Sequence, residues 1–578
     1  MSLAKIEYWA FVFLILIFVS EVSCVYMLNR DFEHLTVVKV EIPNGGQSIS
    51  GLLYRPRSAP FENPMPAVIL VHGISSAKES MSSIALELAK RNIVALTIDV
   101  LGHGDSGGQF GDTRDLSLGT LAAIRYLKIQ PYVNSSSIGL VGHSLGAGAV
   151  RAAAAAEVDV RAVVLIAGGL GEMVADPAYG VFNSTFPKNL MVAIGRQDIL
   201  FDLSQVTKEW LPSIFGSFQE VVPGQLYGDF SSGNARKLVA PNTTHLLEPL
   251  DPSIVSETLD WLYFAFRSGN VDETQVSARY FTYLHREVVM IIAVFAFVGL
   301  ACAILPHISR RLSLKSKKTE PLHGYLEDWK IMTIWGILSI GLFFPMFFFG
   351  FIMPFPPLLF GSSIAWWLLT VGVTGLLFIS LAAPKIFNIK LKIRTVIVES
   401  FTLRSASVAV ILFLLMYLIV CLIDSILGIN LWIYVPMFRV LNPATRIPVF
   451  FVFIPFFMVF FFTEGLFLHT LRIPIEKTGF SAGISALLKT IGIKMAPYLS
   501  VMCLQYLPMF LLDLKLFPSL VGFLIEFFPL ITVQFVISTV FSWWFSRITS
   551  SIGAGAIFNT LIFAWISAGA FPFGGFFS

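Results

Sequence analysis

The chain has 578 residues, of which 55% are hydrophobic, and its mean hydropathy of +0.75 excludes an ordinary water-soluble protein. Charge is unevenly distributed: residues 25–287 hold 20 basic and 26 acidic side chains, whereas the rest of the chain is basic. This asymmetry predicts at least two domains, one mildly acidic and globular and one basic and apolar. Because the basic residues lie beside apolar segments, we expect them to meet the headgroups of membrane lipids rather than nucleic acid.

The first apolar segment, from about Tyr8 to Met27, is long enough for a membrane helix, which needs about 20 apolar residues. A cleavable signal peptide is the alternative, but no small-x-small cleavage site follows the apolar stretch. Cys24 raises a lipoprotein alternative, which Glu21 disfavours because it lies only three residues earlier. We therefore interpret residues 1–28 as an uncleaved signal anchor.

Further long apolar runs return after residue 287, and each predicts a helix because backbone groups in lipid must be paired within their own segment. They lie at about residues 288–306, 331–353, 363–383, 407–428, 447–469, 496–512, 518–545 and 552–572. The division of residues 496–545 into two spans is the least clear. The predicted organisation is a signal anchor, a globular domain at 29–287, and an all-α membrane domain at 288–578 with about eight transmembrane helices.

The cysteines lie in or beside these apolar runs, at Cys24, Cys302, Cys421 and Cys503. Their spacing predicts neither a disulfide framework nor a metal site. Two carboxylates also lie inside predicted spans, Glu464 and Glu526. Charged groups are costly at that depth, so we expect both to face the helix bundle, as interhelical hydrogen-bond partners or as functional groups.

Lys and Arg residues between the predicted spans indicate the orientation of the protein. With the N-terminus in the cytoplasm, inner segments hold 16 basic residues and outer segments hold three. The bias predicts a multi-pass protein of the cell membrane whose 29–287 domain lies outside the cytoplasm. Three N-x-[ST] sequons in this domain, at Asn134, Asn183 and Asn242, are compatible with export and possible sites of glycosylation.

Short apolar runs alternate with helical patterns between the anchor and the second span. Val37–Ile42 and Ser48–Tyr54 predict an opening hairpin. Buried parallel strands are predicted at Ala67–Val71, Ile93–Ile98, Ser137–Val141, Ala162–Ile166 and Leu190–Ile194. Helices are predicted at Met81–Arg91, Leu116–Lys128, Ala147–Ala156 and Ile254–Phe266. This alternation predicts an α/β domain with a mostly parallel central sheet and right-handed crossovers.

One of these strands runs directly into a G-x-S-x-G motif, and a helix of small residues follows it. The motif reads Gly142-His143-Ser144-Leu145-Gly146. A nucleophilic serine on a tight strand-to-helix turn needs this context, since the glycines let the strand and the helix approach without a Cβ clash. A purely structural turn is the alternative. In these residues the chain resembles the α/β-hydrolase superfamily, over about residues 37–266.

The resemblance implies a Ser-Asp-His triad and an oxyanion loop. Residues 71–74, Val-His-Gly-Ile, are similar to that loop, so the backbone N–H groups of Ile74 and Leu145 would bind the developing oxyanion. Gly195-Arg196-Gln197-Asp198 is similar to the family's acid site; Asp198 is the expected acid, with Asp202 as the alternative. His245 is the expected base because it lies between Asp198 and the closing helix. Residues 99–106 are interpreted as a structural loop.

The implied reaction is cleavage of a carboxylic ester, thioester or amide through an acyl-enzyme, without a cofactor or a metal. Residues 168–188 leave room for only a small cap, which predicts a rather open pocket. Two functions remain open at this point. The first is an extracytoplasmic, membrane-bound esterase whose helices hold or deliver a lipid-like substrate. The second is a membrane transporter or assembly scaffold with an accessory hydrolase-like binding domain.

Overall fold

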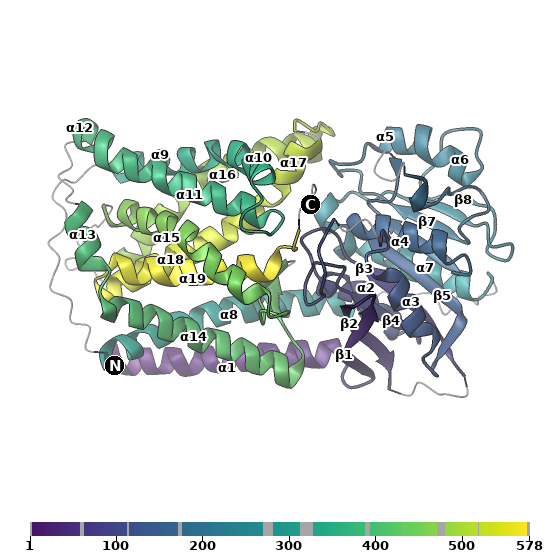
Figure 1. Ribbon diagram of the computed structural model, residues 1–578, viewed down its shortest axis with the longest axis horizontal. Coiled ribbons are helices and arrows are strands. Elements are labelled where there is room, and N and C mark those ends of the chain that lie inside the picture. The colour runs from purple at the N-terminus through teal and green to yellow at the C-terminus, as the bar shows by residue number, and fades with distance from the viewer. Residues whose placement is uncertain are drawn as a thin grey trace.

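The protein consists of an α/β domain and an elongated helix bundle that lie end to end (Figure 1). The computed structural model describes residues 3–57, 63–111, 115–171, 176–269, 281–312, 328–387, 393–433, 435–470, 480–517 and 519–574. The N-terminus lies at the end of the bundle that is far from the α/β domain, whereas the C-terminal segment lies between the two parts (Figure 1).

The α/β domain is built on a nine-stranded sheet, counted over the described residues, with the order β1-β2-β4-β3-β5-β6-β7-β9-β8. The strands are β1 (Leu35–Asn44), β2 (Gln47–Pro56), β3 (Met65–Val71), β4 (Val94–Ile98), β5 (Val133–His143), β6 (Ala162–Ile166), β7 (Leu190–Ala193), β8 (Leu226–Tyr227) and β9 (Arg236–Val239). The six strands from β4 to β9 in this order are parallel, and β1, β2 and β8 pair antiparallel to their neighbours. The predicted hairpin and mostly parallel sheet are thus confirmed.

The predicted helices of this domain are present and cover both faces of the sheet, because the central strands are buried along their whole length. They are α2 (Ser82–Ala89), α3 (Thr120–Lys128), α4 (Leu145–Ala156) and α7 (Pro252–Phe266). Helix α3 begins later than predicted because Asp115 holds the preceding residues in a turn. Its carboxylate accepts hydrogen bonds from the N–H groups of Ser117 at 3.0 Å and of Gly119 at 2.9 Å.

Within the described residues, nine helical segments are long and apolar enough to cross a membrane, one for each predicted span. The helices that form them include α1 (Leu3–Asn29), α8 (Thr282–Arg311), α9 (Asp328–Gly341), α10 (Phe343–Ile352), α11 (Gly361–Leu377), α14 (Leu403–Leu427), α15 (Arg446–Thr470), α16 (Phe480–Leu512), α17 (Ser519–Glu526), α18 (Phe528–Thr549) and α19 (Ile552–Ala570). Residues 496–545 do divide: α16 ends at Leu512, and α17 and α18 form one broken span. Pro529, in the first turn of α18, lacks the N–H that would continue α17.

Helix α19 is the central helix of the bundle, where it packs against α14, α15 and α18. Beside it, Lys494 of α16 forms a buried ion pair with Glu464 of α15, and its ammonium donates to Thr539 Oγ1 at 2.7 Å. This contact gives Glu464 the bundle-facing position that was expected. Lys494 lies inside α16, so the prediction that it belongs to an inner segment between two spans is wrong. Its burial is possible because the pairing with an opposite charge lowers the cost of burying a lysine.

Without Lys494, the segments predicted to be inner still hold more Lys and Arg residues than those predicted to be outer. Several of these basic residues lie outside the described residues: Lys315, Lys317, Lys318, Lys390, Lys392, Arg472 and Lys477. Helix α1 runs from the far end of the bundle to the α/β domain, and α8 runs back alongside it (Figure 1). Arg310 and Arg311, at the end of α8, therefore lie at the end of the bundle that is away from the α/β domain.

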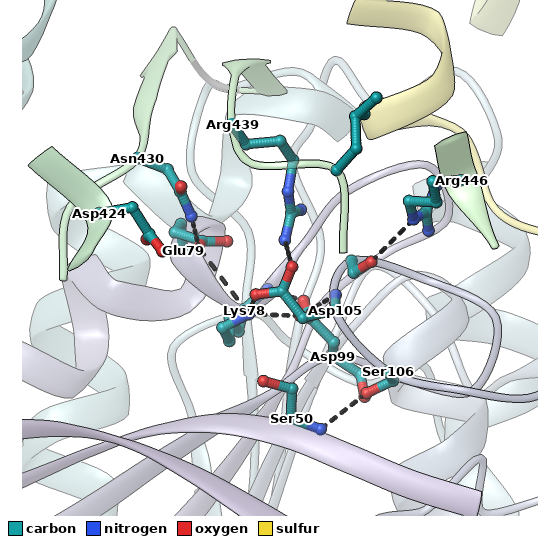
Figure 2. A network of polar contacts seen from close by, with 12 residues as sticks. Ser50, Lys78, Glu79, Asp99, Asp105, Ser106, Asp424, Asn430, Arg439 and Arg446 are labelled. Carbon is teal, nitrogen blue, oxygen red and sulfur yellow. Dashed lines mark hydrogen bonds and ion pairs between the residues drawn. The ribbon is translucent and has the colours of Figure 1, made fainter. Parts of the chain in front are cut away.

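A buried charge network joins the α/β domain to the segment between α14 and α15 (Figure 2). The Lys78 ammonium donates to Asp99 Oδ2 at 2.6 Å and to Asp105 Oδ2 at 2.7 Å. Arg439, from the membrane region, pairs with the other oxygen of Asp105. Burial lowers the pKa of Lys78, but Asp105 and Asp99 raise it by more, so this lysine keeps its charge. Two cations thus face three carboxylates at the contact between the two parts, because Glu79 Oε1 also lies 4.0 Å from the Lys78 ammonium.

The loop at residues 99–106 carries these carboxylates, so its structural role includes docking the membrane region. Arg446 Nε donates to Gly104 O at 3.1 Å, which brings the start of α15 onto the loop. Gly104 has φ +52, and a Cβ there would lie 2.1 Å from Asp99 Cγ. Only glycine fits this close approach of the backbone to a buried carboxylate.

Candidate active site

Ser144 lies on a strained turn between β5 and α4, with φ 53 and ψ −115. Such positive φ values persist in non-glycine residues only where the surroundings impose them. The flanking glycines allow the turn: a Cβ on Gly142 would lie 2.3 Å from Gly146 O, and one on Gly146 would lie 2.3 Å from Val71 O. Strand, turn and helix are therefore as tightly packed as the motif predicts.

Ser144, His245 and Asp198 form a continuous chain of hydrogen-bonding groups. His245 Nε2 lies 3.0 Å from Ser144 Oγ, and His245 Nδ1 lies 2.8 Å from Asp198 Oδ2. Asp198 Oδ1 is held by the N–H of Leu200 at 2.7 Å. Asp202, the alternative acid, instead accepts from the N–H of Gln205 at 3.1 Å as the N-cap of α5 (Leu203–Gln205). The structure thus brings together the expected acid, base and nucleophile.

The charge environment of His245 suits a base whose protonated form is stabilised. Burial lowers the pKa of His245, but the Asp198 carboxylate, its hydrogen bond and the more distant Glu526 raise it by more. The net pKa lies above the ordinary value for histidine. A proton taken from Ser144 would therefore be held by an imidazolium that Asp198 stabilises.

The candidate oxyanion loop lies directly against the serine turn. A Cβ on Gly73 would lie 3.3 Å from Ser144 Cβ, so the chain before Ile74 passes close to the nucleophile. Leu145 is the first residue of α4, whose leading N–H groups have no partner within the helix. Ile74 and Leu145 thus lie in the two segments next to Ser144, and their role as oxyanion donors stays a prediction.

Comparison with known proteins agrees with this architecture. Residues 68–288 match the model of the alpha/beta hydrolase family. This domain has the α/β-hydrolase fold. Among solved structures, the hydrolase domain is similar to Est1E from Butyrivibrio proteoclasticus with bound ferulic acid (19% identity, 40% of this chain and 98% of that chain, TM-score 0.30). It is also similar to the thioesterase domain from the curacin biosynthetic pathway (14% identity, 39% and 99%, TM-score 0.27).

Two curated Mycobacterium tuberculosis proteins, from strains CDC 1551 / Oshkosh and H37Rv, also match part of the chain. Each carries the name "Putative phosphoribosyl transferase" and is 27% identical over 215 residues. The match covers 36% of this chain and 42% of each relative, so the chain spans less than half the length of these proteins.

Two more buried titratable groups flank Ser144, His245 and Asp198. His143 Nε2 lies 3.0 Å from His245 O, and burial lowers the pKa of His143 to about 3, which keeps it neutral. Glu248 Oε1 accepts from Gly195 N at 2.5 Å, and burial together with nearby Asp198 raises the pKa of Glu248 well above its ordinary value. Sequence reasoning missed Glu248, because a lone carboxylate after the base forms no recognisable motif.

His143, His245 and Glu248 also place potential metal-ligand atoms within 4.8 Å of one another. Both ring nitrogens of His245 face Ser144 or Asp198, and His143 Nε2 faces a carbonyl oxygen. Glu248 Oε2 is buried and has no hydrogen-bond partner within the described residues.

Membrane helices cover the hydrolase site, so the expectation of a rather open pocket is wrong. The Phe523 ring of α17 packs edge-on against the His245 ring, with centroids 5.6 Å apart. Glu526 Oε2, at the end of α17, accepts from the N–H of Leu246 at 3.2 Å. His245 is 1% exposed and Ser144 is 9% exposed. The residues that cap the site come from the far end of the sequence rather than from residues 168–188.

The connection between α16 and α17 also contacts the strand end that carries the acid. Gln197 Nε2 donates to Asp513 Oδ1 at 3.1 Å, and Lys515 contacts the backbone oxygen of Asp198. The N–H of Ser519 donates to Ile199 O at 3.1 Å. Neighbours on both sides of Asp198 are thus anchored to the membrane region.

The three sequons lie on the hydrolase domain at different exposures. Asn183 and Asn242 are exposed, whereas Asn134 is half-buried and its side-chain oxygen accepts from Ser136 Oγ at 2.7 Å. Their use for glycosylation remains a prediction.

Replacing Glu526 with glutamine is expected to shift the acidic limb of activity to lower pH. The Glu526 charge raises the pKa of His245, and the base must be neutral, so activity falls as the pH drops through that pKa. Removing the charge lowers the pKa of His245 and extends activity to more acidic conditions. The profile of kcat/KM against pH measures this shift. Glu209→Gln, an exposed carboxylate of the same domain, is the control, and an unchanged acidic limb in Glu526→Gln would contradict the expectation.

Proposed function

We propose that this protein is a membrane-bound serine hydrolase that cleaves a carboxylic ester, with thioesters and amides as chemically related alternatives. The observation that carries the proposal is the linkage of Ser144 to His245 at 3.0 Å and of His245 to Asp198 at 2.8 Å, on a turn with φ 53 at the serine. A turn with a merely structural role has no need for a buried base and acid aligned on its side chain.

In the proposed reaction, Ser144 Oγ attacks the substrate carbonyl carbon while His245 Nε2 takes the hydroxyl proton. The N–H groups of Ile74 and Leu145 would stabilise the negative oxygen of the tetrahedral intermediate. The imidazolium then gives its proton to the leaving alcohol oxygen, which leaves an acyl-enzyme. A water molecule, deprotonated by His245, attacks the acyl-enzyme and releases the carboxylic acid and free Ser144.

Labelling with a small fluorophosphonate tests this proposal. Ser144 Oγ would attack phosphorus and expel fluoride, giving a stable adduct on the full-length protein in detergent or lipid. We expect labelling of the wild type and of Ser231→Ala, a control on an exposed loop serine, but not of Ser144→Ala. Absence of labelling in the folded wild type would contradict the proposal. It would favour the alternative of a transporter or scaffold with an accessory binding domain.

We further propose that the hydrolase domain lies outside the cytoplasm, as the bias of basic residues predicts. In a cysteine-free background, a cysteine at Asn134 is expected to react with a membrane-impermeant maleimide in intact cells. A cysteine at Lys385, exposed near the opposite end of the bundle, is expected to react only after permeabilisation. The reverse pattern of labelling would overturn the orientation.

A further inference from the structure

An apolar cavity lies inside the helix bundle next to the candidate oxyanion loop. It has a volume of about 90 Å³ and is formed by α10, α11, α18 and α19, by Phe527 before α18, and by Ser75 of the hydrolase domain. Aromatic and aliphatic side chains dominate its walls, among them Phe347, Phe360, Ile364 and Phe563. One end of the cavity therefore belongs to the hydrolase domain, and its body belongs to the membrane region.

The cavity reaches the hydrolase domain at Ser75, the residue that follows the candidate oxyanion donor Ile74. Ile74 and Leu145, the candidate oxyanion donors, both pack against the apolar core of the membrane bundle. Ser75 follows Ile74 directly, lines the cavity, and is 4% exposed. Within the described residues its hydroxyl has no hydrogen-bond partner, which is costly for a buried polar group unless a ligand satisfies it. A substrate carbonyl bound by the Ile74 N–H would thus lie one residue along the chain from the cavity wall.

The position of the base decides which half of an ester the cavity would accept. His245 must protonate the leaving oxygen, so the alcohol half lies on the His245 side of the carbonyl carbon. The rings that pack on His245 belong to His143, Phe201 and Phe523, and none of them lines the cavity. The cavity lining instead includes Ser75, next to the candidate oxyanion residue Ile74, and this is the side that remains for the acyl half.

We propose that this cavity binds the acyl chain of a lipid-like ester, which enters from the bilayer and presents its carbonyl to Ser144. The inference rests on the proposed function and specifies its substrate class. The walls come from helices that are apolar enough to span a membrane, so a hydrocarbon chain could pass between lipid and cavity without crossing water. The position of α17 over the site also favours entry from the bilayer. This helix separates the triad from bulk solvent, while the bundle side stays lined by apolar residues.

Matched variants that fill or enlarge the cavity test the proposal. Ile364→Trp fills it, and Leu369→Trp places the same bulk on the same helix outside the cavity lining. Phe347→Ala enlarges it, and Phe348→Ala removes the neighbouring ring, which does not line it. Each full-length variant is assayed with p-nitrophenyl esters of increasing acyl length and with acetate esters of increasing alcohol length.

We expect Ile364→Trp to lower kcat/KM for long-acyl esters by about tenfold to a hundredfold relative to the acetyl ester, the size of a steric mismatch in an apolar pocket. Phe347→Ala should move the optimum to longer acyl chains, and both controls should keep the wild-type profile. An unchanged acyl profile in Ile364→Trp and Phe347→Ala would overturn the proposal, as would a strict preference of the wild type for acetyl or an effect confined to the alcohol series.

Labelling by a small fluorophosphonate separates failure of this inference from failure of the proposed function. Variants that keep Ser144 labelling are folded and active, so an unchanged acyl profile in them counts against the cavity alone. Loss of labelling in the wild type counts against the serine hydrolase itself.

Discussion

Asp198→Asn is expected to lower kcat for a short p-nitrophenyl ester by about 10⁴-fold, the loss typical of a triad whose acid cannot hold the histidine tautomer. An asparagine can keep the hydrogen bond from Leu200 N–H, so the strand end should remain folded. It cannot act as an anionic partner for His245 Nδ1, which lies 2.8 Å from Asp198 Oδ2. Steady-state kinetics at fixed pH measure the change.

Asp202→Asn is the matched control for this prediction. Asp202 lies four residues after Asp198 and is the alternative acid from the sequence, but its carboxylate caps α5. Asparagine is as good an N-cap as aspartate, so we expect near wild-type activity. A large loss of kcat in Asp202→Asn together with a small loss in Asp198→Asn would reverse the assignment of the acid.

Arg439→Ala is expected to lower the free energy of unfolding by about 3–5 kcal/mol, because it breaks a buried ion pair and leaves the carboxylates without one of their two cations. Arg439 is 1% exposed and pairs with Asp105, which also binds Lys78 at 2.7 Å (Figure 2). The contact joins the membrane region to the hydrolase domain, so its loss should weaken both parts together. Thermal or denaturant unfolding of the purified full-length protein measures the effect.

Lys39→Ala provides the control, since Lys39 also makes an ion pair between the two parts, with Asp424, but keeps 35% of its side-chain surface exposed. Exposed pairs contribute about 1 kcal/mol or less. The double variant Asp105→Asn, Arg439→Met should recover part of the loss, because it removes both members of the pair. Equal stability of Arg439→Ala and Lys39→Ala would contradict the importance of the buried network.

The same network predicts a dependence of stability on pH. Burial raises the pKa of Asp105, but Arg439 and Lys78 lower it by more, so the folded-state pKa lies below the ordinary value. A depressed carboxylate pKa stabilises the folded state above the unfolded-state pKa of about 3.9, and this stabilisation is lost as the pH falls. Acidification should therefore destabilise the wild type more than the double variant.

The arrangement of the two parts bears directly on how a substrate would reach Ser144. Helix α17 of the membrane region packs on His245 through Phe523. The candidate oxyanion residues Ile74 and Leu145 face the same bundle. The candidate site is thus built partly from helices of the membrane region.

The sequence by itself determined the features that depend on local patterns. Long apolar runs predicted each of the nine spans, because a membrane helix must satisfy its backbone within its own segment. The serine turn was also predictable, since the glycines that permit it lie within two residues of Ser144. The resemblance to the α/β-hydrolase superfamily gave Asp198 and His245 as the expected acid and base and left Asp202 as the alternative, and the structure places Asp198 beside His245.

Only the tertiary structure decided which distant groups meet. Glu526 was recognisable as a carboxylate in a span, but its contact with Leu246 joins residues 280 positions apart. The pairing of Lys494 with Glu464 and the membrane cover over the triad are equally long-range. Strand β9 was missed because Arg236 and Lys237 interrupt its apolar pattern, and it forms only by pairing with β7. Such contacts depend on how the helices pack and on which charges find partners, and a local pattern carries no information about either.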